Sequence, residues 1–484
     1  MTTETPEKEE QPKPVTALPY ESPSALLWRA GSLTYSKAGL RMLFFWLLWG
    51  DFTIMLRERS VGPTFQYMLK QLHASDFVLG LLVTFIPQAI AMVLGPVISY
   101  RSDRFRGPRG RRIPYLMLST PLCFVGMVGL AMSPKLGALA HPAFAKIWGV
   151  ITFGAAAPLT ATASVLVMVA ICWTIFEIFA IVTATIFNAL IADVVPSGVI
   201  GRFFGLFRMV SLADGMFFSL VLIRHAETHY TEIFLAVGAL FAVSFGLMCL
   251  KVKEGEYPPP ATTTTLGSKP RSFLAAVRIF FRECFTHPYY RWLTLSIALT
   301  FMAFTPINTF SIAFSKALGM SPKVYGFYST GQFAISFCQA YIVGMLVDKF
   351  HPIRLVIVGL CLHSLTVLLA FFLIRGQTSF GVFHVIAGSC AGFWGTAYAP
   401  FLPTVLPRAK YATFASAIGV ASAVGMMVIG PACGWFLDNL VHNQYRYIYL
   451  WCLVFDLLAL MSTLVVYRMF KELGGTRNYV APEV

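Results

Sequence analysis

The chain has 484 residues, of which 57% are hydrophobic and 12% are charged, and its formal net charge is +15. Soluble domains average about 25% charged residues, so this composition excludes a water-soluble globular protein and indicates a multi-pass membrane protein. The excess of Lys and Arg fits membrane-flanking loops, so we expect the lipid bilayer as a partner and no nucleic acid.

Residues 1–38 are polar and proline-bearing, which is typical of a cytoplasmic tail and not of a cleavable signal peptide. Apolar stretches long enough to span a membrane follow in two sets. The first set lies at 39–69, 76–101, 113–134, 163–193, 199–222 and 231–251. The second set lies at 289–315, 322–347, 353–374, 380–406, 410–438 and 444–469. The sequence therefore predicts an all-α membrane protein with twelve transmembrane helices in two six-helix bundles, 39–251 and 289–469.

The segments between and after these helices complete the predicted topology. We expect residues 135–162 to form an external loop, and residues 252–288 to form a cytoplasmic linker with a surface-lying helix near 271–284. Residues 470–484 form a second tail. The even number of spans, with most Lys and Arg in predicted cytoplasmic segments, places both termini in the cytoplasm.

A charged motif recurs after the second and the eighth predicted helix. The two copies are Ser99-x-x-x-Asp103-Arg104 and Gly344-x-x-x-Asp348-Lys349. Two six-helix halves with a shared repeat signature are the plan of a major facilitator transporter. The sequence therefore favours this fold.

The first copy opens a loop, residues 101–114, that holds six arginines and is hard to move across a bilayer. Charges in such a loop can hold helix ends together in one conformation and release them in another. We predict a cytoplasmic gate made of Asp103, Arg104, Arg111, Arg112, Asp348 and Lys349. The alternative is a charge run that only orients the chain.

Charged side chains inside the predicted helices are concentrated in the first half, and such residues mark ion or substrate pathways. Helix length places them in two layers: Asp51 with Arg208, and an acidic layer of Glu58, Glu177 and Asp214. Asp51, Glu58, Glu177 and Asp214 are candidates for proton coupling, since a partly dry carboxylate can bind and release a proton. The alternative for each is a structural ion pair, for example with Arg57 or Arg59.

The second half offers polar and aromatic candidates for substrate binding: Asn308, Gln332, Gln339, Trp394 and Tyr398. Aromatic faces and amide groups suit sugar rings, whereas the alternative for each residue is packing. We expect His363, His384 and Asp456 to have structural roles. The nine cysteines form no metal-binding spacing, so we expect no metal, no disulfide and no cofactor other than a coupling proton.

Three regions resemble the glycoside-pentoside-hexuronide cation symporters and the related sucrose-type proton symporters of the major facilitator superfamily. They are Trp49-Gly50-Asp51-Phe52, Ser102-Asp103-Arg104 through Arg109-Gly110-Arg111-Arg112-Ile113-Pro114, and Ala189-Leu190-Ile191-Ala192-Asp193 with Phe207-Arg208-Met209 and Gly215. The resemblance implies that Asp51 and Arg208 contact a sugar. It covers mainly residues 40–220.

The departures from this family bear on the coupling ion. Ala91 and Gly95 stand where sodium-using members carry an acidic pair, and Ala184 stands in place of an aspartate that joins sugar to cation. Ser99 replaces the usual glycine of the loop motif. Proton coupling through Glu177 or Asp51 therefore fits better than a sodium site.

The sequence thus predicts a monomeric, proton-coupled symporter of a sugar or glycoside, working by alternating access in a bacterial inner membrane. The first alternative is a proton-coupled exporter of another small solute. The second is a non-transporting membrane sensor on the same fold. An enzyme is not expected, because the chain shows no nucleophile–base set and no phosphate loop.

Overall fold

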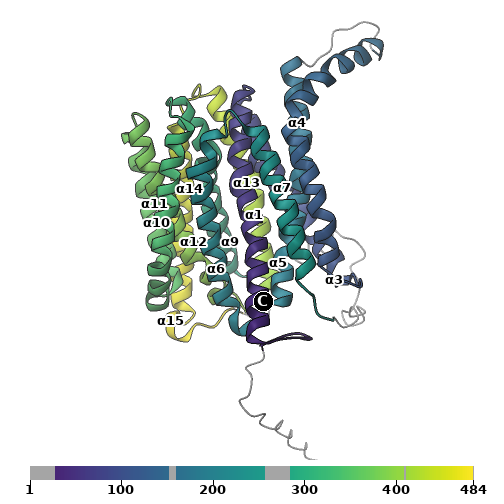
Figure 1. Cartoon of the computed structure of the whole chain (residues 1–484). Coiled ribbons are helices and arrows are strands. Elements are labelled where there is room, and N and C mark those ends of the chain that lie inside the picture. The colour runs from purple at the N-terminus through teal and green to yellow at the C-terminus, as the bar shows by residue number, and fades with distance from the viewer. Residues whose placement is uncertain (1–27, 152–159, 257–283, 408–409, 483–484) are drawn as a thin grey trace, which may run out of the picture.

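The computed structural model describes residues 28–151, 160–256, 284–407 and 410–482. Within these ranges, 12 helices are long and apolar enough to cross a membrane. Each half of the chain packs mainly on itself, and the result is a pair of helical bundles (Figure 1). The structure therefore confirms the predicted all-α fold with two six-helix bundles.

The helices of the first bundle include one long span built from several pieces, in which α2 (Asp76–Gly80) passes through a π-helical turn, η1 (Leu81–Phe85), into α3 (Ile86–Arg104). The others are α1 (Lys37–Gln71), α4 (Ile113–Ile151), α5 (Ala161–Val194), α6 (Ile200–Phe217) with its π-helical extension η3 (Phe218–Leu222), and α7 (Tyr230–Lys251). The second bundle contains α9 (Pro288–Ala317), α10 (Pro322–Phe350), α11 (Pro352–Leu373), α12 (Gln377–Val405), α13 (Tyr411–Asn439) and α14 (Tyr447–Glu472). A short α15 (Gly475–Asn478) follows.

Local sequence signals explain where several of these helices begin. The Ser36 hydroxyl accepts the N–H of Gly39 at the start of α1, and the Thr160 hydroxyl accepts the N–H of Ala163 at the start of α5. Such bonds satisfy backbone donors that the first helical turn leaves free. In α9, α10 and α11 a proline occupies the first turn, where its missing N–H costs nothing.

Helix α4 is longer than expected, so the prediction of an external loop is wrong for residues 135–151. The first part of this segment packs on α5. Gly137 lets the helices approach, since a Cβ there would lie 2.6 Å from the Cα of Val165, and His141 Nδ1 lies 2.9 Å from Ser164 Oγ. Figure 1 shows α4 rising beyond the other helices and bending near its end. The helix contains three prolines, a residue at which helices bend. Residues 152–159 lie outside the described ranges.

A small β-hairpin precedes α1, in a region that we expected to be a plain tail. Strand β1 (Trp28–Ala30) pairs antiparallel with β2 (Leu33–Tyr35) around Gly31, whose φ is +58°. The Ser32 hydroxyl bonds the backbone of Glu256, which ties the hairpin to the segment after α7. Residues 1–27 and 257–283, with most of the expected surface helix, lie outside the described ranges.

The hairpin and the C-terminus lie at the same end of the molecule, which we call the near end (Figure 1). At the opposite, far end the two bundles touch backbone to backbone. A side chain at Gly80 would collide with the carbonyl of Gly430, and one at Gly326 would collide with that of Ser219. At the near end, by contrast, Tyr100 and Tyr341 are 60% and 75% exposed. The bundles are therefore closed on each other at the far end.

Candidate functional site

A cavity of about 410 Å³ lies within the first bundle, between α1, η1–α3 and α5. Its polar lining comes from three helices: Arg57 and Glu58 of α1, Gln88 of α3 and Glu177 of α5. Trp173 and Phe176 form part of its apolar wall. The structure thus brings together Glu58 and Glu177, which were predicted from separate helices.

Arg57 is the buried cation of this cavity, with a relative exposure of 1%. Its guanidinium carbon lies 4.9 Å from the ring centroid of Phe241 and 6.0 Å from that of Phe176. Its Nη2 lies 3.5 Å from a carboxylate oxygen of Glu58, and its charge also acts on Glu177. Aromatic faces stabilise a cation that has been removed from water. Arg57 is thereby held where it can balance one of the two carboxylates.

The two carboxylates outnumber this single cation. With Glu58 and Glu177 ionised and Arg57 charged, the lining carries one excess negative charge. The Glu58 side chain is 46% exposed, so it is open to an incoming group. The cavity can therefore accept a proton, a cation or a hydroxyl group that donates a hydrogen bond.

Asp51 lies outside this lining and is fully buried, at 0% exposure. Neither of its carboxylate oxygens has a hydrogen-bond partner among the described residues. Asp214 of α6 is also buried, at 1%, and one of its oxygens has no hydrogen-bond partner in the described part of the chain; its charge acts on Asp51. The structure thus buries two predicted proton-coupling residues, Asp51 and Asp214, on the neighbouring helices α1 and α6.

Asp51 and Arg208, which we predicted to lie in one layer, differ in exposure in this conformation. Arg208 is exposed on α6 and makes no ion pair with Asp51. It interacts electrostatically with Arg59, whose Nη2 donates to the Ser211 hydroxyl at 3.3 Å. The Arg59 guanidinium also lies 5.1 Å from the ring centroid of Phe333 on α10. Arg59 therefore reaches the second bundle.

The candidates of the second half do not line the cavity of the first bundle. Trp394 and Tyr398 stack on each other with a centroid separation of 4.7 Å, and Trp394 Nε1 has no partner among the described residues. Asn308 is exposed on α9, whereas the Gln332 side chain packs against Gly388. Gln339 donates to the carbonyl of Ser389 at 2.7 Å. In this conformation Gln332 and Gln339 thus contact α12.

Three further polar residues make contacts between helices of the second bundle. His363 Nδ1 lies 2.6 Å from a carboxylate oxygen of Asp456, and both residues are buried. His384 Nε2 lies 3.2 Å from the hydroxyl of Ser329. These contacts join α11 to α14 and α12 to α10, which fits the structural roles that we expected.

An ion-pair network at the near end connects the predicted gate residues of the first half. Arg111 and Arg112 both bond the carboxylate of Asp193 at the end of α5, and Arg112 also bonds Asp103 and Ser102. Asp193 had entered the sequence analysis only through the family resemblance. Each of these partners belongs to the first bundle, so the network joins α3, α4 and α5 of one bundle.

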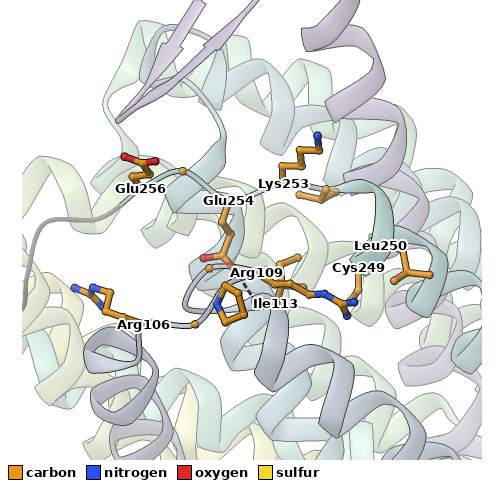
Figure 2. A pocket seen from close by; sticks show the side chains of 13 residues that line it. Arg106, Arg109, Ile113, Cys249, Leu250, Lys253, Glu254 and Glu256 are labelled. Atoms are coloured by element: carbon orange, nitrogen blue, oxygen red, sulfur yellow. Dashed lines mark hydrogen bonds between the residues drawn. The ribbon is translucent and has the colours of Figure 1, made fainter.

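Glu254 is a near-end residue that sequence reasoning missed. Its carboxylate accepts the backbone N–H groups of Arg111, Arg112 and Ile113, at 2.9, 2.8 and 2.5 Å, and so caps the start of α4. Figure 2 shows Glu254 pointing from the segment after α7 toward the loop, beside a cavity of about 760 Å³. A lone glutamate after a helix gives no signal of a contact 141 residues away.

The other predicted gate residues lie apart from this network. Arg104 stacks on Tyr100, with its guanidinium carbon 3.6 Å from the ring centroid. Asp348 and Lys349 are exposed at the end of α10, and within the described ranges Asp348 makes no ion pair. Next to them, burial and the neighbouring Arg354 lower the pKa of His351. The two copies of the motif are therefore not joined to each other here.

A protein-family model described as Major Facilitator Superfamily matches residues 47–431. No curated protein matches the chain at a significant level.

Several solved transporters share its fold. A bacterial homolog of the human lysosomal transporter Spinster, in an inward-facing and occupied conformation, has a TM-score of 0.60 at 17% identity, covering 92% of this chain and 98% of that one. A D-xylose-proton symporter has a TM-score of 0.60 at 15% identity, covering 88% and 96%. The nucleoside transporter NupG has a TM-score of 0.59 at 10% identity, covering 88% and 100%. At these identities the likeness shows the fold alone.

Proposed function

Because the chain belongs to the Major Facilitator Superfamily, we propose that it is a secondary transporter that moves a small solute by alternating access. The near end faces the cytoplasm, since the loop 101–114 at that end holds six arginines. On this assignment the conformation is closed to the outside, and both termini are cytoplasmic. A bacterial inner membrane and a monomeric state remain part of the proposal.

The proposal of proton coupling rests on one observation, the buried carboxylate of Asp51, which bonds none of the residues that the structure describes. An ionised carboxylate without a partner is strongly destabilised in a dry interior, and Asp214 beside it adds like-charge repulsion. A bound proton removes both penalties. Asp51 and Asp214 thus form a proton site, while Glu58 and Glu177 present acidic groups to the cavity.

The proposed cargo is a sugar or glycoside, moved in the same direction as the proton. The cavity supports this class because Glu58, Glu177 and Gln88 offer acceptors for sugar hydroxyls beside the aromatic Trp173. The resemblance to sugar symporters through Asp51 and Arg208 points the same way. The intramembrane charges also argue against a non-transporting sensor, which has no need of them.

A second candidate is the exchange of an organic cation for protons. The excess of carboxylates over cations in the cavity lining favours it, since a cation and a proton would compete for Glu58 and Glu177. This candidate corresponds to an exporter.

Uptake into proteoliposomes distinguishes the two. A panel of labelled disaccharides, glycosides and organic cations is offered with and without an imposed proton gradient. Gradient-driven accumulation of a sugar supports symport, and gradient-driven movement of a cation against proton flow supports exchange. If no sugar moves while reconstitution is verified, the sugar proposal is wrong.

A further inference from the structure

The far end of the molecule holds polar contacts between the bundles that the proposed proton and cargo sites do not involve. The carboxylate of Asp438, at the end of α13, accepts the backbone N–H groups of Asp76 and Phe77 at 2.9 and 2.8 Å. These are the first residues of α2, which continues into α3. A side chain of the second bundle therefore caps a membrane-spanning helix of the first bundle.

The same junction contains a buried ion pair. Lys70 Nζ lies 2.5 Å from a carboxylate oxygen of Asp76, and it donates to the hydroxyl of Tyr445, across the bundle interface, at 3.2 Å. Asp76 has 0% exposure. Tyr445 thus adds a second bond between the bundles beside the cap.

A second contact lies elsewhere on the far end. Lys316 Nζ, at the end of α9, lies 2.7 Å from a carboxylate oxygen of Glu227, which precedes α7. The side chains are 26% and 31% exposed, so water screens this pair less than a surface pair. Gln71 donates to the backbone carbonyl of Glu227, which anchors the acidic partner to the end of α1.

These bonds share one property. Among the described residues, the side-chain hydrogen bonds that join the two bundles all lie at the far end. If the bundles rock apart at this end, each of these bonds must break, whereas contacts inside one bundle can persist. The far-end bonds therefore contribute free energy to one conformation only.

We propose that the Asp438 cap, the Lys70–Asp76–Tyr445 group and the Glu227–Lys316 pair form a three-part latch that sets the balance between the far-closed and far-open states. This inference rests on the alternating access of the proposed function, but not on the cargo or the coupling ion. Breaking one part shifts the equilibrium toward the far-open state by the free energy that this part contributes to the far-closed state.

Hydrogen exchange, measured by mass spectrometry on the full chain in lipid nanodiscs, tests the latch. In D438A we expect hydrogen exchange to rise roughly tenfold in peptides covering 76–82 and 219–229. Losing a hydrogen bond to a charged group changes the equilibrium between the two states by about that factor. We also expect exchange to fall in the near-end segment 98–106, because the near end closes as the far end opens. The matched control is N439A, since Asn439 bonds only the Trp435 carbonyl of its own helix among the described residues.

A charge swap supplies a second variant if D438A folds poorly. K316E and E227K should each raise far-end exchange, and the double variant should restore the wild-type pattern by rebuilding the pair in reverse. Exchange that rises at both ends would mean simple destabilisation and would overturn the proposal, as would unchanged exchange in D438A. Opposite shifts at the two ends support the latch even if the uptake experiment finds no sugar.

Discussion

Asp51 is as buried as Leu47 on the same helix, yet its carboxylate has no hydrogen-bond partner among the described residues. Asp51→Asn preserves its shape and removes its ability to carry a proton. We expect D51N to fold with unchanged or higher thermal stability, because the neutral amide avoids the cost of a buried charge. Proton-driven accumulation should be lost, while cargo exchange at equal pH continues. If D51N still accumulates cargo fully in proteoliposomes, the coupling proton binds at another residue.

At the residue scale, the sequence identified the charges but not their pairing. Glu58 and Glu177 were expected in one layer and do line one cavity with Arg57. Asp51 and Arg208 were expected in one layer, and in this conformation they make no ion pair with each other. Helical periodicity places a residue on a face and at a depth, but it does not fix how neighbouring helices are rotated.

At the scale of elements, the start of α4 depends on a distant carboxylate. Glu254→Gln removes the negative charge and one acceptor oxygen from the cluster of three N–H groups. We expect a loss of about 1–2 kcal/mol in stability, measured as a lower melting temperature in detergent. Glu256→Gln is the control, since that side chain bonds no described residue. An equal loss in both variants would contradict the role of Glu254.

The contact between α4 and α5 leads to a second prediction at this scale. Gly137→Ala forces a Cβ to within 2.6 Å of the Val165 backbone, whereas Gly246→Ala on α7 meets no atom within 4 Å. Alanine favours a helix over glycine by about 0.5–1 kcal/mol. We therefore expect G246A to raise the melting temperature and G137A to lower it. A gain in both would show that the α4 extension does not pack on α5 as described.

The limits of each predicted helix agree with the structure to within a few residues, except for α4. Apolar stretches of spanning length strongly indicate transmembrane helices, because a soluble protein could not expose so much apolar surface to water. The extension of α4 is missed because no sequence pattern reveals the contacts that Gly137 and His141 make with α5. The cap by Asp438 is missed because its partners lie 362 residues away in the chain.

At the scale of the whole molecule, close packing between the bundles stabilises the far-closed state. Gly430→Ala places a methyl group against Thr84 of the other bundle, whereas Gly419→Ala on the same helix meets open space. We expect G430A to favour the far-open state and to expose Cys433, which is now fully buried one turn away. Faster modification of Cys433 by an impermeant thiol reagent, measured by mass spectrometry, checks this. Equal labelling in G430A, G419A and wild type would contradict it.

Helix α4 has 39 residues, a length of roughly 58 Å, whereas the hydrocarbon core of a bilayer is about 30 Å thick. The end of α4 therefore forms a stem that stands clear of the bilayer on the far side, beyond the other helices (Figure 1). Such a stem is a landmark for particle alignment in electron microscopy. A binding protein raised against its tip would give mass and asymmetry to a pseudo-symmetric body, without touching the surfaces that move during transport.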